Sequence, residues 1–346
     1  FGRKGSVDRH AYIDTQYEGW FQGSDCIRVR CVDSVDSLFV SYYLRLESVK
    51  KQINHSAVGS TMASLNTDVR KGIELKLPDI TVQKRIATDL YRIDSKIALN
   101  NKINAELESM AKTIYDYWFT QFDFPDENGR PYKSSGGKME WNEELQREIP
   151  EGWEVRKLDE LGSFKNGVNY EKDCYGNRTV KIVNVRNISE SSCFIFNGDL
   201  DSIKLPSELV TQYIINDADI LIARSGISGA TRLMIKDDTK TSIYCGFIIR
   251  YEVNDIASKN YLFNFIKQRE RQSLATAAGT VLKNVSQDIL KEIYVPVPSD
   301  DIIMRYNTVV TPIYTKLQEQ IKVNKKFIEL RDWLLPMLMN GQVEVD

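Results

Sequence analysis

The chain contains an internal repeat with an offset of 220 residues. Residues 59–122 align with residues 279–342 without a gap, and eleven positions are identical, Gly59, Pro78 and Asn104 among them. Both copies run in the same order, from a glycine-containing loop through an apolar strand ending at proline to a long helix. A repeat of this kind predicts two halves that fold alike.

The similarity continues upstream at an offset of 221. FGRKGSVDRHAYI (1–13) resembles LIARSGISGATRLMI (221–235), which places Arg3 on Arg224. Residues 150–220 of the second copy have no counterpart ahead of Phe1. We therefore expect the first globular domain to be incomplete here, with about 70 residues of its first half absent.

Two long helices are predicted behind the globular segments. Residues 83–122 contain no proline or glycine, and apolar residues recur there in alternating steps of four and three. This heptad pattern is typical of a coiled coil, and the helix would be about 60 Å long. The first seam is Ile86, Leu90, Ile93, Ile97, Asn100, Asn104, Leu107, Ala111, Ile114 and Trp118. The second is Tyr306, Val310, Ile313, Leu317, Gln320, Asn324, Phe327, Arg331, Leu334 and Leu338.

Amides interrupt both seams at matching positions: Asn100 and Asn104, and Gln320 and Asn324. Polar seam residues weaken a coiled coil but penalise other registers, so they favour a spacer of fixed length. The alternative is that the amides face solvent at a local defect. In the second helix, Pro312 is expected to produce a kink or to mark the true helix start.

Composition excludes several other classes of protein. Charged residues make up 27% and the net charge is −2, so a uniformly basic coat protein is excluded but a local basic face is not. Five scattered cysteines without a C-x-x-C pair, and two histidines, argue against zinc sites and disulfides and indicate buried free thiols. No long apolar run or leader is present, which predicts a soluble, cytoplasmic protein.

Residues 150–300 read as an α+β domain. Strands are predicted at 180–185, 220–223, 242–251 and 293–297, and a helix at 260–275. No P-loop, dinucleotide-binding loop, Asn–Pro–Pro–aromatic tetrapeptide or nucleophile constellation is found, so the chain carries no predicted catalytic site.

Loops of this domain combine amides, cations and glycine, the groups that pair with base edges and position phosphates. Each loop alone is also typical of a solvated turn. The candidate DNA-binding residues are Arg3, Lys4, Lys165, Asn166, Asn169, Tyr170, Lys181, Arg186, Asn187, Arg224, Ser225, Lys283 and Asn284.

Several segments of the sequence resemble a known protein family. The block LPDITVQKRIATDLYRIDSKIALNNKINAELESMAKTIYDYWFTQFDF (77–124) and the segment IPEGWEVRKLDELGSFKNG (149–167) are similar to the specificity subunit of type I restriction–modification enzymes. The segments ADILIARSGISG (218–229) and KNVSQDILKEIYVPVPS (283–299) and the tail PMLMNGQVEV (336–345) are similar too.

The resemblance implies an α+β fold with two target recognition domains, the first incomplete here, separated by long helices that form an antiparallel coiled coil. It implies the end of the first recognition domain at 1–80, a central long helix at 81–124 and a polar linker at 125–148. The second recognition domain would follow at 149–300, and a C-terminal long helix at 301–346. Each domain would read one half of a bipartite DNA site, and the helices would set the half-site spacing.

The resemblance also implies that the subunit is not itself catalytic and holds no cofactor or metal. Two methyltransferase subunits and motor–nuclease subunits would bind it, and adenosylmethionine, ATP and magnesium would belong to them. A second copy of the chain is a further possible partner if the start is truly short. Two alternatives stay open: a coiled-coil adaptor that binds proteins, and the recognition part of a single-chain restriction–modification enzyme.

Overall fold

The computed structural model describes residues 1–2, 7–56, 73–170, 176–226, 228–235, 241–276 and 285–343. In the helix Lys259–Thr276, side chains are described up to residue 270. The chain divides into two compact units. Unit 1 comprises Phe1–Lys102 and Val323–Asp346, and unit 2 comprises Ile103–Lys322. Each unit is described by itself.

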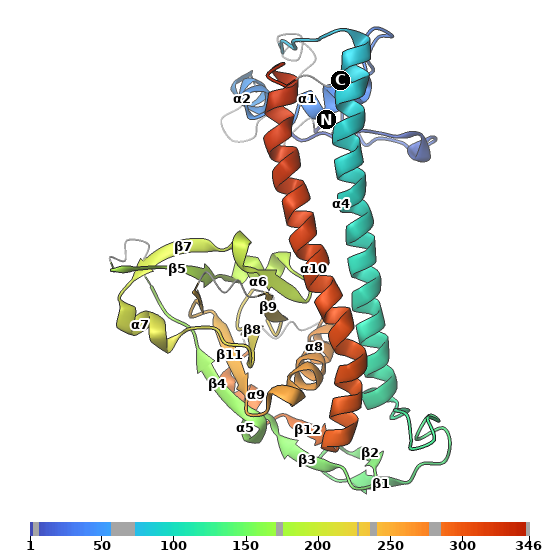
Figure 1. Cartoon of the computed structure of the whole chain (residues 1–346), viewed down its shortest axis with the longest axis vertical. Coiled ribbons are helices and arrows are strands. Elements are labelled where there is room, and N and C mark those ends of the chain that lie inside the picture. The colour runs from blue at the N-terminus through green and yellow to red at the C-terminus, as the bar shows by residue number, and fades with distance from the viewer. Residues whose placement is uncertain are drawn as a thin grey trace. The chain divides into compact units, whose positions relative to one another are not determined.

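The helices are α1 (Ser37–Tyr43), α2 (Glu47–Ser56), α4 (Ile80–Tyr115), α5 (Leu158–Leu161), α6 (Val185–Glu190), α7 (Ser207–Gln212), α8 (Lys259–Thr276), α9 (Gln287–Lys291) and α10 (Asp300–Met339). The strands are β1 (Met139–Asn142), β2 (Arg147–Pro150), β3 (Glu154–Lys157), β4 (Gly162–Asn166), β5 (Arg178–Val183), β6 (Phe194–Phe196), β7 (Asp201–Leu205), β8 (Asp219–Ala223), β9 (Thr231–Ile235), β10 (Ser242–Tyr244), β11 (Ile248–Val253) and β12 (Tyr294–Val297). Figure 1 labels these elements on the whole chain, except β6 and β10.

Unit 1 packs α1 and α2 against the start of α4 and the end of α10. Its core joins Phe39 and Tyr42 of α1 to Leu90 of α4 and Leu338 of α10. Gln83 is buried near the start of α4, where its amide accepts the Asp36 N–H (2.9 Å) and donates to a main-chain carbonyl (2.8 Å). A polar side chain at this helical position therefore fastens α4 to the start of α1.

A charged residue in the second seam has a partner on the first helix. Arg331 donates to Asp94 (3.0 Å), and Tyr42 and Arg45 donate to the same carboxylate at 2.9 Å each. Burial alone would raise the pKa of Asp94, but the hydrogen bonds from Arg331, Arg45 and Tyr42 outweigh it and hold the pKa below its usual value. Asp94 thus joins α4, α10 and the end of α1.

Two seam amides, Asn100 and Asn324, meet across the helix pair. Asn324 is buried, its Oδ1 accepts from Asn100 (2.9 Å), and its Nδ2 donates to Asn101 (2.8 Å). In unit 2 the ring of Trp118 lies 5.8 Å from that of Tyr306. Residue numbers therefore rise along α4 as they fall along α10, which confirms the expected antiparallel pair. At this layer the amides face each other rather than solvent.

Replacing Asn324 with leucine is expected to destabilise unit 1 by about 1–2 kcal/mol, because the half-buried amide of Asn100 loses its partner, while the exposed Asn101 can turn to water. The double replacement Asn100→Leu/Asn324→Leu is expected to recover that loss, since both facing amides of the layer are then apolar. Urea unfolding measures both. Lys326→Leu, at an exposed position of α10, is the matched control and should change stability by less than about 0.5 kcal/mol. A loss in the double variant as large as in the single one would contradict this account.

Unit 2 is built on a five-stranded sheet in the order β4-β11-β8-β9-β6. β11 is antiparallel to both β4 and β8, β8 is antiparallel to β9, and β6 is parallel to β9. A three-stranded sheet, β10-β5-β7, the two-stranded sheet β12-β3 and the hairpin β1-β2 complete the unit. The central strand β8 is buried at all five positions, as a strand covered on both faces should be.

Aromatic side chains close the junction where α4 ends. Tyr115, Trp118 and Phe119 are buried with Tyr261 of α8 and Tyr306 of α10, and the Phe119 ring lies 4.7–4.8 Å from the last two. The α-helix stops at Tyr115 and continues as a π-helical turn, so it is about 54 Å long rather than the expected 60 Å.

One of the two alternatives for Pro312 and one predicted strand were wrong. α10 starts at Asp300 and runs through Pro312, which therefore does not begin the helix. Pro312 lies on the exposed face, where water can satisfy the carbonyl that loses its partner. The predicted strand 242–251 is two strands, β10 and β11, because the chain turns at 245–247 and the two pair in different sheets.

Two further expectations are modified. The segment 125–148, expected as a polar linker, contains β1 and part of the β1–β2 hairpin. Among the described cysteines, Cys193 and Cys245 are buried, Cys31 is half-buried, and Cys26 is exposed, against the expectation of burial. No helix in the described ranges combines the length and apolar character that crossing a membrane requires.

Asp219, at the start of β8, carries a stability that depends on pH. The residue is 1% exposed, and burial raises its pKa to about 6, only partly offset by the Asn216 N–H (2.6 Å) and by Arg250 (3.7 Å). Because its pKa is raised in the folded state, the Asp219 carboxyl contributes to stability below about pH 4. About 3 kcal/mol of this contribution is lost as the pH rises from about 4 to about 6.

Asp219→Asn is therefore expected to lose this pH dependence. Relative to the parent, its free energy of unfolding should rise by up to about 3 kcal/mol between pH 4 and pH 7, since other carboxyl groups are common to both proteins. Urea unfolding at four pH values across this window measures the difference. Parallel curves for the two proteins would show that Asp219 titrates normally.

Candidate nucleic-acid interface

Four strands of unit 2 meet at one edge of the five-stranded sheet. β4 ends there at Asn166 and β8 at Ala223, while β9 begins at Thr231 and β11 at Ile248. Because neighbouring strands in this set are antiparallel, the loops attached to these ends lie side by side. We call this set the loop edge: residues 166–170, 224–226, 228–230 and 245–247.

Backbone hydrogen bonds join the loops of this edge. Gly246 N donates to Val168 O (2.8 Å), and Val168 N donates to Tyr244 O (3.0 Å). Arg224 N donates to Phe247 O (2.9 Å). The β10–β11 turn thus contacts the loops on both sides and fixes their relative positions.

Two further segments reach the loop edge. Cys245 N donates to Val183 O (3.0 Å), which brings the end of β5 and the start of α6 to it. Val285 N donates to Arg224 O (3.0 Å), which brings the segment leading into α9. Five stretches separated in sequence therefore converge on one region.

Glycine is required where these backbones approach each other. A Cβ at Gly167 would fall on the carbonyl group of Cys245, and a Cβ at Gly246 would fall on the side-chain oxygen of Asn169. Burial raises the pKa of the Cys245 thiol, so this cysteine acts as a packing group. The glycines of the sequences KNG and CGF therefore permit the loops to touch.

The end of β4 and the loop after it carry four predicted DNA-binding residues, Lys165, Asn166, Asn169 and Tyr170. Asn166 and Asn169 are exposed. Tyr170 is half-buried and its hydroxyl donates to Asn184 (3.1 Å). Lys165 extends away from the sheet to the Gln212 carbonyl (2.9 Å), with its Nζ 4.7 Å from the ring centre of Tyr213.

The predicted DNA-binding residues on β5 and α6 differ in their exposure and in the hydrogen bonds that their side chains already make. Lys181 donates to the Leu200 carbonyl (2.7 Å), and Arg186 is exposed with Asp201 at 3.3 Å. Asn187 is buried, and its Oδ1 accepts the N–H of Asn184 (2.8 Å) at the start of α6. We therefore expect Asn187 to position this helix rather than to contact DNA, which revises the expectation from sequence.

The loop after β8 contributes the predicted residues Arg224 and Ser225, both half-buried. The Arg224 guanidinium donates to the Gly246 carbonyl at 3.4 Å, so it lies against the β10–β11 turn. The candidates Arg3, Lys4, Lys283 and Asn284 lie outside the described residues.

Phe247 was missed by the sequence analysis. It lies at the tip of the β10–β11 turn and is 62% exposed, although its neighbour Ile248 is fully buried. The available signal was a glycine–aromatic pair inside an apolar run. That pair was read as part of a continuous strand, which hid the turn.

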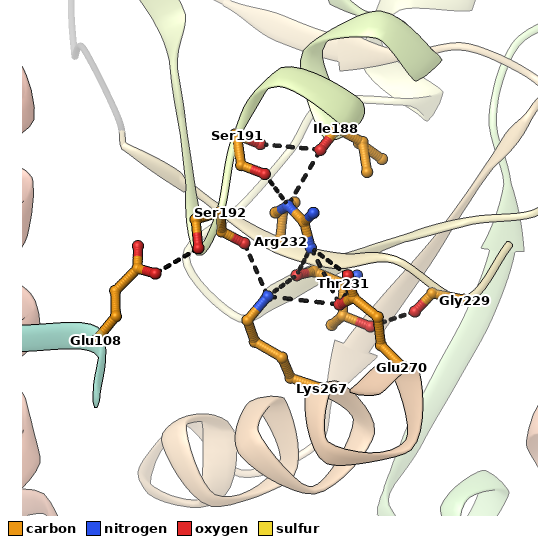
Figure 2. A network of polar contacts seen from close by, with 9 residues as sticks. All are labelled: Glu108, Ile188, Ser191, Ser192, Gly229, Thr231, Arg232, Lys267 and Glu270. Carbon is orange, nitrogen blue, oxygen red and sulfur yellow. Dashed lines mark hydrogen bonds and ion pairs between the residues drawn. The ribbon is translucent and has the colours of Figure 1, made fainter. Parts of the chain in front are cut away.

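A buried ionic network contacts the start of β9, next to the loop edge. Glu270 of α8 accepts from Arg232 (3.1 Å) and Lys267 (3.4 Å), and all three side chains are 6–8% exposed. Its Oε2 also accepts the N–H of Thr231 (3.0 Å), where residues 228–230 enter β9. Figure 2 shows these residues together with Ser192, whose hydroxyl donates to Glu108 of α4.

The same network holds the turn after α6. Arg232 Nε donates to the carbonyl groups of Ile188 (3.1 Å) and Ser191 (2.8 Å), and Lys267 donates to that of Ser192 (2.7 Å). Figure 2 shows Arg232 at the centre of these contacts. The buried charges of this network therefore pair with each other and with main-chain carbonyl groups. They contribute to the site by holding the backbone at the start of β9 and after α6 in place.

The donor set of a metal centre is not seen in the part of the chain that the structure describes. No three His, Cys, Asp or Glu side chains gather there in a metal-binding arrangement. The groups that do gather at the loop edge are amides, one guanidinium and two aromatic rings. These groups contact bases and phosphates through hydrogen bonds and stacking.

Comparisons with known proteins identify the family. The family model of the type I restriction modification DNA specificity domain matches residues 1–109 and 150–328. The chain is 26% identical over 321 residues to the type I restriction enzyme MjaIX specificity subunit of Methanocaldococcus jannaschii, covering 91% of this chain and 71% of that protein. It is 24% identical over 348 residues to the HindI specificity subunit of Haemophilus influenzae, covering 85% and 74%.

A solved structure shares the fold. The S subunit of a type I restriction–modification system from M. genitalium superposes with a TM-score of 0.52 at 18% identity, over 88% of this chain and 73% of that one. The family match covers most of the chain and includes residues from both copies of the repeat. The chain therefore belongs to the type I restriction–modification DNA specificity family, as a specificity subunit that is itself non-catalytic and carries no cofactor.

Proposed function

We propose that residues 149–300 form a target recognition domain that reads one half of a bipartite DNA site through the loop edge. Residues 1–80 would belong to the domain that reads the other half. The observation that carries the proposal is the convergence of Asn166, Asn169 and Arg224 on one edge of one sheet. Amides pair bidentately with adenine and guanidinium groups with guanine.

We propose further that the antiparallel pair α4–α10 sets the distance between the half-sites. The Asn100–Asn324 hydrogen bond favours one register, since a slip would separate the buried Asn324 amide from its half-buried partner Asn100. A slip of one heptad, about 10 Å, corresponds to about three base pairs of B-DNA. A fixed register therefore gives a fixed spacing.

The subunit would act as the centre of a larger complex in the cytoplasm. Two methyltransferase subunits would dock on it, motor–nuclease subunits would add restriction, and adenosylmethionine, ATP and magnesium would be held by these partners. This part of the proposal follows from membership of the family. Light scattering on the purified complex distinguishes one from two copies of the specificity chain.

The test is selection from a pool of randomised DNA duplexes by the chain in complex with a methyltransferase subunit. The expected result is an enriched sequence made of two short blocks at a fixed spacing. Its affinity should fall steeply with salt, because phosphate contacts release counterions. Enrichment of no sequence, with salt-independent binding of a protein partner, would favour a coiled-coil adaptor instead.

Arg224→Ala in the same selection is expected to relax preference in one block only, by about 1–3 kcal/mol at the affected base pair. Arg130→Ala is the matched control, since Arg130 is exposed and pairs with Asp126 in a turn outside the loop edge. Equal loss in both blocks, or equal effects of the two variants, would contradict a local reading role for Arg224.

A further inference from the structure

The side chain of Phe247 is presented outward by an otherwise buried segment. Cys245 is 4% exposed and Ile248 is 0% exposed, while Phe247 between them is 62% exposed. A single exposed apolar side chain is common on protein surfaces, so exposure alone decides nothing. What distinguishes Phe247 is the structure that holds it.

The turn that carries Phe247 is fixed from several directions. Ile248 N donates to Cys245 O (2.9 Å), which closes the turn. The Phe247 carbonyl accepts from Arg224 N (2.9 Å), and the Gly246 carbonyl accepts from the Arg224 guanidinium (3.4 Å). Gly246 N donates to Val168 (2.8 Å). The ring therefore projects from a backbone that is ordered before any ligand binds, which lowers the entropy cost of using it.

The side chains that lie against the turn carrying the ring are polar and cationic. Arg224 lies against its turn, and the Asn169 side chain lies against Gly246. An aromatic ring among amides and a guanidinium matches a nucleic acid, in which apolar base faces lie inside rows of polar edges and phosphates. Proteins that bind DNA insert phenylalanine between base pairs and partly unstack one step.

We infer that Phe247 enters the base stack of the half-site read by the loop edge and partly unstacks one base step. The inference rests on the proposed function and adds a residue that reads how easily a step deforms rather than its hydrogen-bonding edges. Flexible pyrimidine–purine steps would be favoured at this position, because unstacking them costs least.

The test uses the duplex obtained by selection, with 2-aminopurine placed at each position of one half-site in turn. The parent complex should raise 2-aminopurine fluorescence at one step. Phe247→Ala should abolish that rise and weaken binding at least tenfold, with the salt dependence unchanged because no phosphate contact is lost. Phe247→Trp should keep the rise, since indole also stacks.

Trp141→Ala is the matched control, because Trp141 is 57% exposed on β1, outside the loop edge and its sheet. It should bind as the parent does. A fluorescence rise that persists in Phe247→Ala would overturn the inference and leave the proposed function standing. So would unchanged DNA binding with loss of a co-purified methyltransferase subunit, which would place the ring at a protein interface. Failure of the parent to select any sequence would overturn both.

Discussion

Replacing Glu270 with methionine is expected to destabilise unit 2 by about 3–5 kcal/mol, because the change removes the carboxylate with which two buried cations pair. Arg232 and Lys267 both pair with Glu270, and all three are almost fully buried. Water cannot replace the lost charge at this depth. Urea unfolding of the full chain measures the loss.

A second cost comes from the main chain. Glu270 accepts the N–H of Thr231, and methionine would leave that buried donor unsatisfied. Thr231 follows directly on residues 228–230 of the loop edge. We therefore expect partial relaxation of DNA sequence preference even in conditions where the variant stays folded.

Two controls separate charge from packing. Arg186→Met removes one partner of a pair whose side chains are 57% and 58% exposed, and should cost less than about 1 kcal/mol. The triple variant Arg232→Met/Lys267→Met/Glu270→Met should be less destabilised than Glu270→Met, since no unpaired charge remains. If the triple variant were as unstable as the single one, lost packing would explain the effect and the ion pairs would not.

The long helices were the most predictable part of this fold. Their seams follow a 3.5-residue period, and a period is a property of the sequence alone. The structure buries or half-buries every residue of the first seam, from Ile86 to Trp118. Arg331 is a charged residue at a seam position where an apolar one is expected. The structure explains it, because Arg331 pairs with Asp94, which lies beside the seam on the facing helix.

The loop edge was only partly predictable. Composition pointed to Asn166, Asn169 and Arg224, but it could not show that the loops carrying them meet, because that depends on the antiparallel order of β4, β11 and β8. Asn187 has the same chemistry in sequence and is buried at a helix start. Phe247 was hidden because a turn flanked by apolar residues looks like a strand.

Adding one heptad to both long helices is expected to change the spacing of the DNA site by about three base pairs. A second copy of residues 97–103 in α4 and of residues 321–327 in α10 repeats the Asn100–Asn324 layer and keeps the seams in register. Each helix grows by about 10 Å. Binding to duplexes with the original spacing should fall at least about 100-fold, because the two half-sites can no longer be engaged together.

The measurement is a spacing series, in which the two selected blocks are separated by every spacer from three base pairs shorter to six longer. Seven residues added to the exposed turn at 127–129 lengthen the chain without touching the seam and should leave the preferred spacing unchanged. Adding the heptad to α4 alone should unfold the pair, because its seam then has no partner over two turns. A doubly extended variant that remains helical by circular dichroism and still prefers the original spacing would show that α4 and α10 do not set the distance between the half-sites.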